Sequence, residues 1–272
     1  MERARQGEAE VRQFATPASH TELSSQFDLP ADRVNDWHAH GALTTHFLNT
    51  FSVMAPAFER FIIASTRHYQ SLITDSKLKE RLAGLIAQEA MHSREHRQYN
   101  RLLDQAGLPG RELERQCYRF LDYLLGEHRV APSFRLAVAL MFEHHTALAS
   151  TVTLNNPALL EGSVPGYAQL WNWHAREETE HKSAAYDLWN SVMGRGVKSY
   201  LLRTGALVLA GPPTLLMAVI VFTRLLKADR KRRVDARAVW LFLKHMYGTG
   251  GLIANTAKLW FKYFLPGFHP DR

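Results

Sequence analysis

Two Glu-x-x-His motifs, each embedded in a long helical pattern, restrict the possible folds of this chain more than any other feature. The first motif is Glu89 and His92 in QEAMHSREH, and the second is Glu178 and His181 in HAREETEHK. An α-helix advances about 100° per residue, so positions i and i+3 share a face one turn apart. Each motif therefore directs one carboxylate and one imidazole to the same side of its helix.

Both motifs lie on apolar stripes whose steps alternate between three and four residues, the period of a helix face that packs into a bundle. Potential ligands thus occupy positions where leucine would otherwise point into a core. The stripe also selects Glu178, which lies at its centre, over Glu177, which lies beside it. The first stripe comprises Leu78, Leu82, Leu85, Glu89, His92, His96, Tyr99, Leu103 and Ala106, and the second comprises Trp171, His174, Glu178, His181, Ala185, Leu188 and Val192.

A lone glutamate precedes each motif, Glu59 in FERF and Glu143 in FEHHTA. A four-helix bundle uses this ligand set to hold two metal ions in its core. The interval between Glu89 and Glu143 is the longest, which indicates two short hairpins joined by one long connection, as in ferritin-like bundles. We therefore predict an all-α, ferritin-like four-helix bundle with six metal ligands. These ligands are Glu59, Glu89, His92, Glu143, Glu178 and His181.

The expected cofactors are two divalent metal ions, because four carboxylates and two neutral imidazoles balance their charge. Buried carboxylates without such compensation would be unfavourable. Oxygen-rich ligation favours iron, with manganese and zinc as alternatives. His96, His174 and Glu177 are candidates for supporting the ligands or for additional ligation. The competing interpretation is a set of exposed or salt-bridged helix residues, since a single Glu-x-x-His is common.

Turn residues divide the chain into three predicted parts. Residues 1–35 are polar and predict a loose arm with one short helix, and residues 36–200 form the predicted bundle. Residues 201–272 form a predicted C-terminal appendage of apolar and basic helices. Within the bundle, Pro56 predicts a kink or a new helix shortly before Glu59.

The appendage contains an apolar run, residues 204–223, that is long enough to cross a bilayer. Gly211, Pro212 and Pro213 predict that this run divides into two short halves. Three arrangements are open: an interfacial or re-entrant hairpin, a buried helix pair, and a membrane-spanning segment. The basic cluster KADRKRR at 227–233 follows directly and favours an anionic membrane surface as a partner.

The formal net charge of +7 is compatible with nucleic acid or anionic lipid as a partner, but no nucleic-acid-binding motif is present. We therefore expect no nucleic-acid partner. Cys117 is the only cysteine, so no intrachain disulfide forms. The polar beginning MERARQGEAEVRQ favours a cytoplasmic location, peripheral to the inner membrane if the appendage binds lipid. A homodimer is expected only by analogy with other bundles.

The segments FERF, QEAMHSREHRQYN, HAREETEHK continuing into AAYDLW, and YFLPGFHP resemble a bacterial family known as predicted metal-dependent hydrolases. They extend over roughly residues 37–270, and the HxxEExEH block is the most specific. The resemblance implies a ferritin-like fold, a metal site and hydrolysis.

The ligand set leads to three functional hypotheses. The first is a di-iron enzyme that activates oxygen to oxidise a small lipophilic substrate, which would also require an electron donor. The alternative is metal-dependent hydrolysis, in which two metals activate water and an ester or phosphoester. A second alternative is metal binding without catalysis.

Overall fold

The computed structural model describes residues 26–231 and 234–271, without the side chains of His181 and Lys258. Every regular element in this part of the chain is a helix, which confirms the all-α prediction. The α-helices are α2 (Ala42–Gln70), α3 (Ser76–Gln105), α4 (Gly110–Leu125), α5 (Pro132–Asn155), α6 (Pro165–Met193), α7 (Val197–Ala228), α8 (Ala236–Tyr247) and α9 (Leu252–Phe261). The short 3-10 helices are η1 (Ala31–Arg33), η2 (Pro157–Leu159) and η3 (Lys262–Phe264).

Local sequence signals account for the starts of α3, α5 and α6. The Asp75 carboxylate accepts hydrogen bonds from the backbone N–H groups of Lys77 and Leu78, at 2.8 and 3.1 Å, and so caps α3. Pro132 and Pro165 occupy the first positions of α5 and α6, where a missing N–H costs nothing. The starts of these three helices therefore follow from residues close in sequence.

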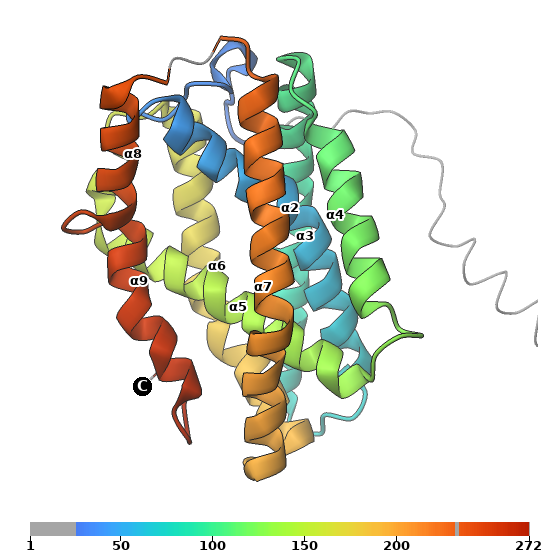
Figure 1. Ribbon diagram of the computed structural model, residues 1–272. Helices are drawn as coiled ribbons and strands as arrows, with labels where there is room; N and C mark the ends of the chain where they lie inside the picture. The colour runs from blue at the N-terminus through green and yellow to red at the C-terminus, as the bar shows by residue number, and fades with distance from the viewer. Residues whose placement is uncertain (1–25, 232–233, 272) are drawn as a thin grey trace, which may run out of the picture.

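Four helices enclose the centre of the molecule (Figure 1). α2 packs against α3 and α5 packs against α6, while α2 also contacts α5 and α3 also contacts α6. α4 lies in the long connection and packs on both α2 and α3. The two hairpins and their long link agree with the prediction, whereas membership in the ferritin-like superfamily stays a prediction. Fully buried side chains of the core include Leu82, Leu85, Leu103, Leu136, Leu170 and Leu188.

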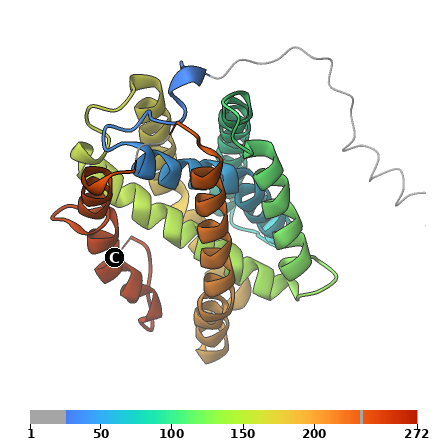
Figure 2. The ribbon, with the colours of Figure 1, turned by 45° about the horizontal axis from the view of Figure 1, so that its top comes forward.

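The predicted division of residues 204–223 and a new helix at Pro56 are both wrong, whereas a kink at Pro56 stays a prediction. Pro56 lies inside a continuous α2, and Pro212 and Pro213 lie inside a continuous α7. A proline within a helix removes one hydrogen bond and costs about 3 kcal/mol. Buried side chains on both sides outweigh this cost in α7, because Ala206 and Leu225, on either side of the prolines, both belong to the main hydrophobic core. In Figures 1 and 2, α7 runs across α5 as one long helix.

The segment before α2 is held in place. Val34 is buried, and the Trp37 ring stacks on Tyr167 with ring centroids 5.3 Å apart. The side chain of Asn35 donates a hydrogen bond to the Asp229 carboxylate at 2.9 Å, in the turn after α7. The prediction of a loose arm is therefore wrong for residues 26–35, while residues 1–25 lie outside the described part of the chain.

The C-terminal residues return to the core. α9 packs against α5, and the guanidinium of Arg203 in α7 donates hydrogen bonds to the carbonyl oxygens of Tyr263 and Leu265. The predicted helices of residues 201–272 are α7, α8 and α9 in the structure. The three-part division at residues 35 and 200 stays a prediction, although Tyr263 shares one core with α2–α6.

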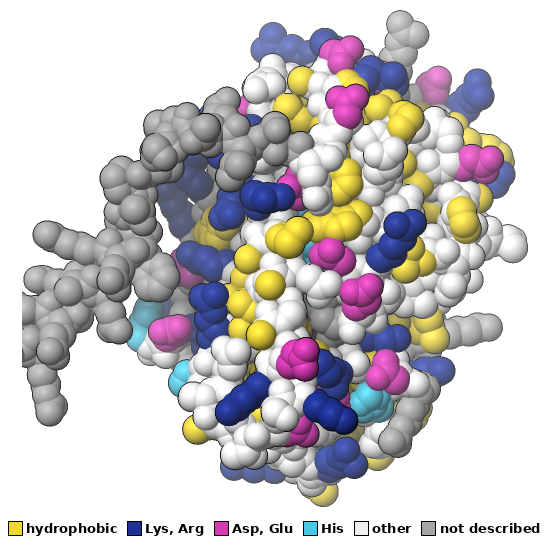
Figure 3. Space-filling view, turned by 180° about the vertical axis from the view of Figure 1, so that it is seen from behind, with side chains coloured by type: hydrophobic (Ala, Val, Ile, Leu, Met, Phe, Trp, Pro, Cys, Tyr) yellow, Lys and Arg dark blue, Asp and Glu magenta, His cyan; other side chains and the backbone are white. Residues whose placement is uncertain are grey.

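The outer side of α7 is apolar and exposed. Within the described residues, one helix, α7, is long and apolar enough to cross a membrane by length and composition. The opposite face of the molecule carries interspersed basic and acidic side chains (Figure 3). Exposed side chains of α7 include Leu201, Val208, Leu209, Leu215, Leu216 and Val219.

Candidate metal centre

Four glutamates meet in the core, one from each of the four central helices. Glu59 comes from α2, Glu89 from α3, Glu143 from α5 and Glu178 from α6, and none is more than 3% exposed. Oxygen atoms of Glu89, Glu143 and Glu178 lie within 4.8 Å of one another. The structure therefore brings together the four carboxylates that the helical stripes predicted.

Burial and mutual repulsion make these carboxylates hard to ionise together. Burial raises the pKa of Glu89 well above its usual value, and the charges of Glu178, Glu143 and Glu59 raise it further. Burial is also the largest influence that raises the pKa of Glu59, although a hydrogen bond with Ser93 acts in the opposite direction. A cation at the centre would remove this penalty.

His92 lies between two carboxylates of α6. Its Nε2 atom is 3.1 Å from the Glu177 carboxylate, and its Nδ1 atom is 3.6 Å from that of Glu178. A histidine that binds a metal usually shares its other ring proton with a carboxylate or carbonyl. A proton on Nε2 would face Glu177 and would leave the Nδ1 lone pair for a metal ion at the centre. Glu177 therefore lies beside His92, and its predicted role as a supporting residue or an additional ligand stays a prediction.

A second chain of imidazoles leads away from Glu178. His174 Nε2 lies 3.2 Å from the Glu178 carboxylate, and His174 Nδ1 lies 3.1 Å from His96 Nε2. His96 Nδ1 is in turn 3.0 Å from the Ser52 hydroxyl in α2. Burial, with the neighbouring His174 and His92, lowers the pKa of His96 well below its usual value. Both histidines therefore lie next to the carboxylates, and their roles as supporting residues or ligands stay predictions.

Sequence analysis missed Ser52, although one signal was available. Ser52 precedes Glu59 by seven residues, two helical turns, and so lies on the same face of α2. The backbone of His181 lies in α6 one turn after Glu178, but its side chain is outside the described residues, so its predicted role stays a prediction.

The donor set fits divalent metal ions. One group combines Glu59, Glu89 and His92, and another combines Glu89, Glu143 and Glu178, with the ligand atoms of each group within 4.8 Å. Carboxylate oxygens with a minority of imidazole nitrogens suit iron, manganese and zinc. Either protonation or bound cations can neutralise this many buried carboxylates. Their convergence with imidazoles in one place favours metal ligation over packing alone.

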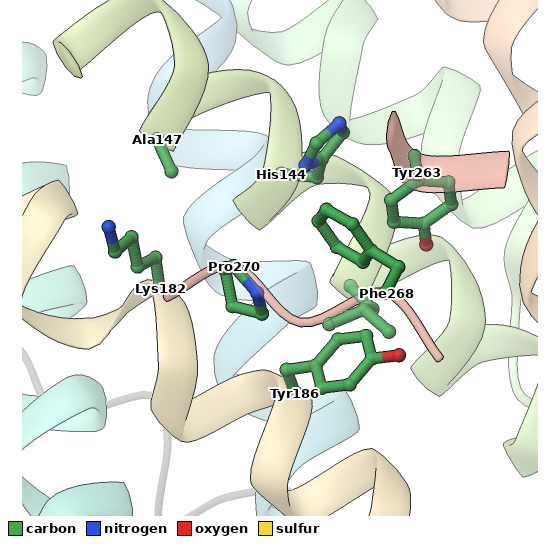
Figure 4. Close-up of a pocket in the computed structure, with 8 residues that line it drawn as sticks. His144, Ala147, Lys182, Tyr186, Tyr263, Phe268 and Pro270 are labelled. Atoms are coloured by element: carbon green, nitrogen blue, oxygen red, sulfur yellow. The ribbon is translucent and has the colours of Figure 1, made fainter. Parts of the chain in front are cut away.

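A small pocket lies between α5, α6 and the C-terminal segment (Figure 4). Phe268 and Pro270 of that segment lie among the side chains of His144, Lys182 and Tyr186. Lys182 also forms an ion pair with Asp271 at 3.6 Å. Two lining residues of the pocket are close in sequence to predicted ligands: His144 directly follows Glu143, and Lys182 follows Glu178 by one helical turn.

Comparison with known proteins supports a metal-dependent protein. The model of a family described as "Predicted metal-dependent hydrolase" matches residues 23–272. No curated protein and no solved structure matches the chain. Since the match covers nearly the whole chain, including every carboxylate of the centre, this protein belongs to the predicted metal-dependent hydrolase family.

Proposed function

We propose that this protein is a hydrolase that uses two divalent metal ions bound between α2, α3, α5 and α6. The convergence of four buried carboxylates from four helices carries the proposal. The family description favours hydrolysis over the oxidative reaction that the ligand pattern led us to expect. The residues that would hold the ions are Glu59, Glu89, His92, Glu143, Glu178 and His181. Glu89 belongs to two of the donor groups.

Bound metal ions would act as Lewis acids and lower the pKa of water, as in other two-metal hydrolases. The chain's own residues orient the ligands. The Glu177 carboxylate lies 3.1 Å from His92 Nε2, so it would orient the ring when Nδ1 binds a metal ion. Because the Glu177 side chain is 18% exposed, whereas that of His92 is fully buried, Glu177 also connects the centre with solvent.

The Ser52–His96–His174–Glu178 chain can hold and pass a proton. Each neighbouring pair lies between 3.0 and 3.2 Å, within hydrogen-bond distance. Movement of a proton from His174 Nδ1 to His96 Nε2 requires each ring to exchange its donor and acceptor nitrogens. The two imidazoles therefore change tautomer together. At the buried end of the chain, the Ser52 hydroxyl donates to Asn100 Oδ1 at 3.1 Å and can accept from His96 Nδ1.

We propose that the small pocket between α5, α6 and the C-terminal segment marks where the apolar part of a substrate binds. Tyr186, Tyr263 and Phe268 supply most of its aromatic lining. His144 Nε2 is buried and has no hydrogen-bond partner among the described residues, so it is available to a polar group of a bound molecule. We infer that the substrate is a small lipophilic ester or phosphoester.

Hydrolysis is tested on the full chain after metal removal and separate reloading with Zn²⁺, Mn²⁺ or anaerobic Fe²⁺. p-Nitrophenyl esters of increasing acyl length and bis-p-nitrophenyl phosphate serve as substrates. We expect at least one metal to restore turnover, and Glu178→Gln to lower kcat/KM at least about 100-fold. Glu180→Gln, an exposed change two residues away on α6, is the matched control. Equal activity of Glu178→Gln and wild type would refute the assignment.

Oxidation of a lipophilic substrate is the second candidate, favoured by the carboxylate-rich donor set, which suits iron. Oxygen consumption by the reduced, iron-loaded protein, without ester or phosphoester turnover, would select it. Bound metal with neither activity would indicate metal binding without catalysis.

We also propose that the exposed apolar side of α7 docks on an anionic membrane surface. Residues 195–272 contain 14 Lys and Arg but only 3 Asp and no Glu, so their formal net charge is +11. The rest of the chain is therefore net negative, because the whole chain carries +7. Exposed basic residues lie at both ends of α7, Lys198 at the start and Lys227, Arg230 and Lys231 at the end. An apolar surface with positive ends matches a bilayer with negative headgroups.

Vesicle sedimentation tests this docking. The protein should bind phosphatidylcholine vesicles that contain phosphatidylserine, and binding should fall at high salt. The double variant Leu209→Glu with Leu216→Glu should weaken binding at least about tenfold, because each leucine contributes about 1.5–3 kcal/mol when buried. Leu72→Glu, at a comparably exposed leucine outside α7, is the control. Unchanged binding of the double variant, or self-association through α7 without vesicle binding, would refute the proposal.

A further inference from the structure

Three histidines meet at a second place in the molecule, away from the carboxylates. His38 and His40 lie in the segment before α2, and His245 lies in the last turn of α8. Their ring centroids are 5.1 Å apart for His38 and His40, 5.0 Å for His38 and His245, and 5.3 Å for His40 and His245. One ring nitrogen from each lies within 4.8 Å of the other two.

Two of these rings have a buried nitrogen without a partner. The Nδ1 atoms of His40 and His245 are buried and form no hydrogen bond with the described residues. His245 itself is only 4% exposed. A buried polar atom without a partner costs about 1–3 kcal/mol, so two in one cluster indicate a missing binding partner. Phenylalanine at these positions would form the same aromatic contacts without leaving a buried nitrogen unpaired.

The hydrogen bonds of His38 are those of a metal ligand. Its Nε2 atom lies 2.8 Å from the carbonyl oxygen of Leu159, which places the ring proton on Nε2 and the lone pair on Nδ1. That lone pair now accepts from the backbone N–H of His40 at 3.0 Å, a short-range contact that a metal ion would replace. The carbonyl bond orients the ring in advance.

All three imidazoles are held neutral, the form that binds metals. Burial lowers the pKa of His38 to about 3 and that of His245 to about 4. Burial, followed by the charge of Lys244, lowers the pKa of His40 as well. Protonation therefore does not compete with a metal ion at pH 7, although Lys244 weakens the binding of a cation.

We propose that His38, His40 and His245 form a second metal site, which binds a divalent ion such as Zn²⁺ and fastens α8 to the segment before α2. Three imidazoles and one water complete the tetrahedral shell that zinc prefers, with Zn–N bonds of about 2.0–2.1 Å. Small rotations of the rings bring ligand atoms at most 4.8 Å apart to that geometry. The site shares no residue with the carboxylate centre and does not depend on the reaction proposed for it.

Zinc binding to the full chain tests the site. The metal-free protein is dialysed against ZnCl₂ at pH 7.5, and the bound zinc is measured by mass spectrometry. Wild type should retain one more ion per chain than His245→Phe, which keeps the aromatic contacts but offers no ligand. His68→Phe, at an exposed histidine of α2, should match wild type. The double variant Glu89→Gln with Glu178→Gln should lose the central ions and keep this one.

Hydrogen exchange provides the second measurement. Zinc should slow exchange across residues 236–247 in wild type and leave it unchanged in His245→Phe. If His245→Phe does not fold, His40→Gln removes a ligand at a less buried position and should give the same two differences. Equal zinc content in wild type and the folded variant, or equal protection of α8, would overturn the proposal.

Discussion

Replacement of Glu89 by glutamine tests whether the buried carboxylates are metal ligands or only core polar groups. Glu89 is 1% exposed and is surrounded by the charges of Glu178, Glu143 and Glu59. Glutamine keeps the shape of the side chain and removes the charge. The substitution should therefore have opposite effects on the stability of the metal-free and metal-loaded proteins.

In the metal-free protein, Glu89→Gln should be stabilising at pH 8. An ionised group in a protein interior costs several kcal/mol even after relaxation, of which we expect glutamine to recover about 2–3 kcal/mol. For a chain of this size, about 2–4 °C of Tm correspond to each kcal/mol, so the gain is about 4–12 °C. In the metal-loaded protein, the variant should bind less metal and unfold at a lower temperature than wild type.

The sign of the pH dependence follows from the raised pKa of Glu89. A carboxyl whose pKa is raised in the folded state contributes stability that is fully present below its unfolded pKa and lost as pH rises through the folded pKa. The advantage of Glu89→Gln in the metal-free protein should therefore shrink as pH falls towards 4.5 and grow as pH rises. Thermal unfolding monitored by circular dichroism, with and without a chelator, measures both trends.

Glu80→Gln is the matched control, since it makes the same chemical change at an exposed position of α3. It should change stability by less than about 0.5 kcal/mol in either form. A metal-free Glu89→Gln protein that is less stable than wild type at pH 8 would refute the electrostatic reasoning. Unchanged metal content would refute the assignment of Glu89 as a ligand.

Three further predictions concern the fold. Gly166→Ala should destabilise the protein by about 1–3 kcal/mol, because the added Cβ would lie 1.5 Å from the Asp28 carbonyl oxygen. Gly84→Ala, in open space on α3, should stabilise the protein by about 1 kcal/mol. Chemical denaturation measures both changes. Asp229→Asn should cost about 1–3 kcal/mol at pH 7. Burial raises the pKa of Asp229, but hydrogen bonds from His46 and Asn35 outweigh burial and lower the pKa. The stability that the Asp229 carboxylate contributes is therefore present above pH 3.8 and lost as pH falls through its folded pKa. Acid unfolding curves of wild type and Asp229→Asn should converge at low pH. Cys117 is buried and its pKa is raised to about 12, so it should react with an aromatic disulfide reagent only as fast as the protein unfolds; rapid reaction of the native protein would contradict its burial.

Much of the bundle followed from local chemistry. Asp75 supplies a cap for α3, and Pro132 and Pro165 occupy first positions of α5 and α6, so the ends of these helices depend on residues close in sequence. The stripes that carry Glu89 and Glu178 also depend only on helical periodicity. These features were predictable because each follows from interactions within about two helical turns.

Interruptions and appended elements were not predictable in the same way. Pro212 breaks a helix in isolation, but α7 continues because its two halves contribute side chains to a core built from other helices. The sequence of the segment before α2 is polar and predicts a loose arm. In the structure, a buried hydrogen bond from Asn35 to Asp229, 194 residues later, connects this segment to the end of α7. Long-range packing outweighed local preference in both cases.

The sequence by itself determined which side of each helix carries the carboxylates and histidines, because helical geometry converts spacing into direction. Only the tertiary structure decided which of these groups meet. It placed Glu177 of α6 beside His92 of α3, and it brought His245 to His38 and His40 across about 200 residues. Periodicity describes one helix at a time, whereas ligand geometry depends on how separate helices pack against each other, and the sequence carries no local signal for that packing.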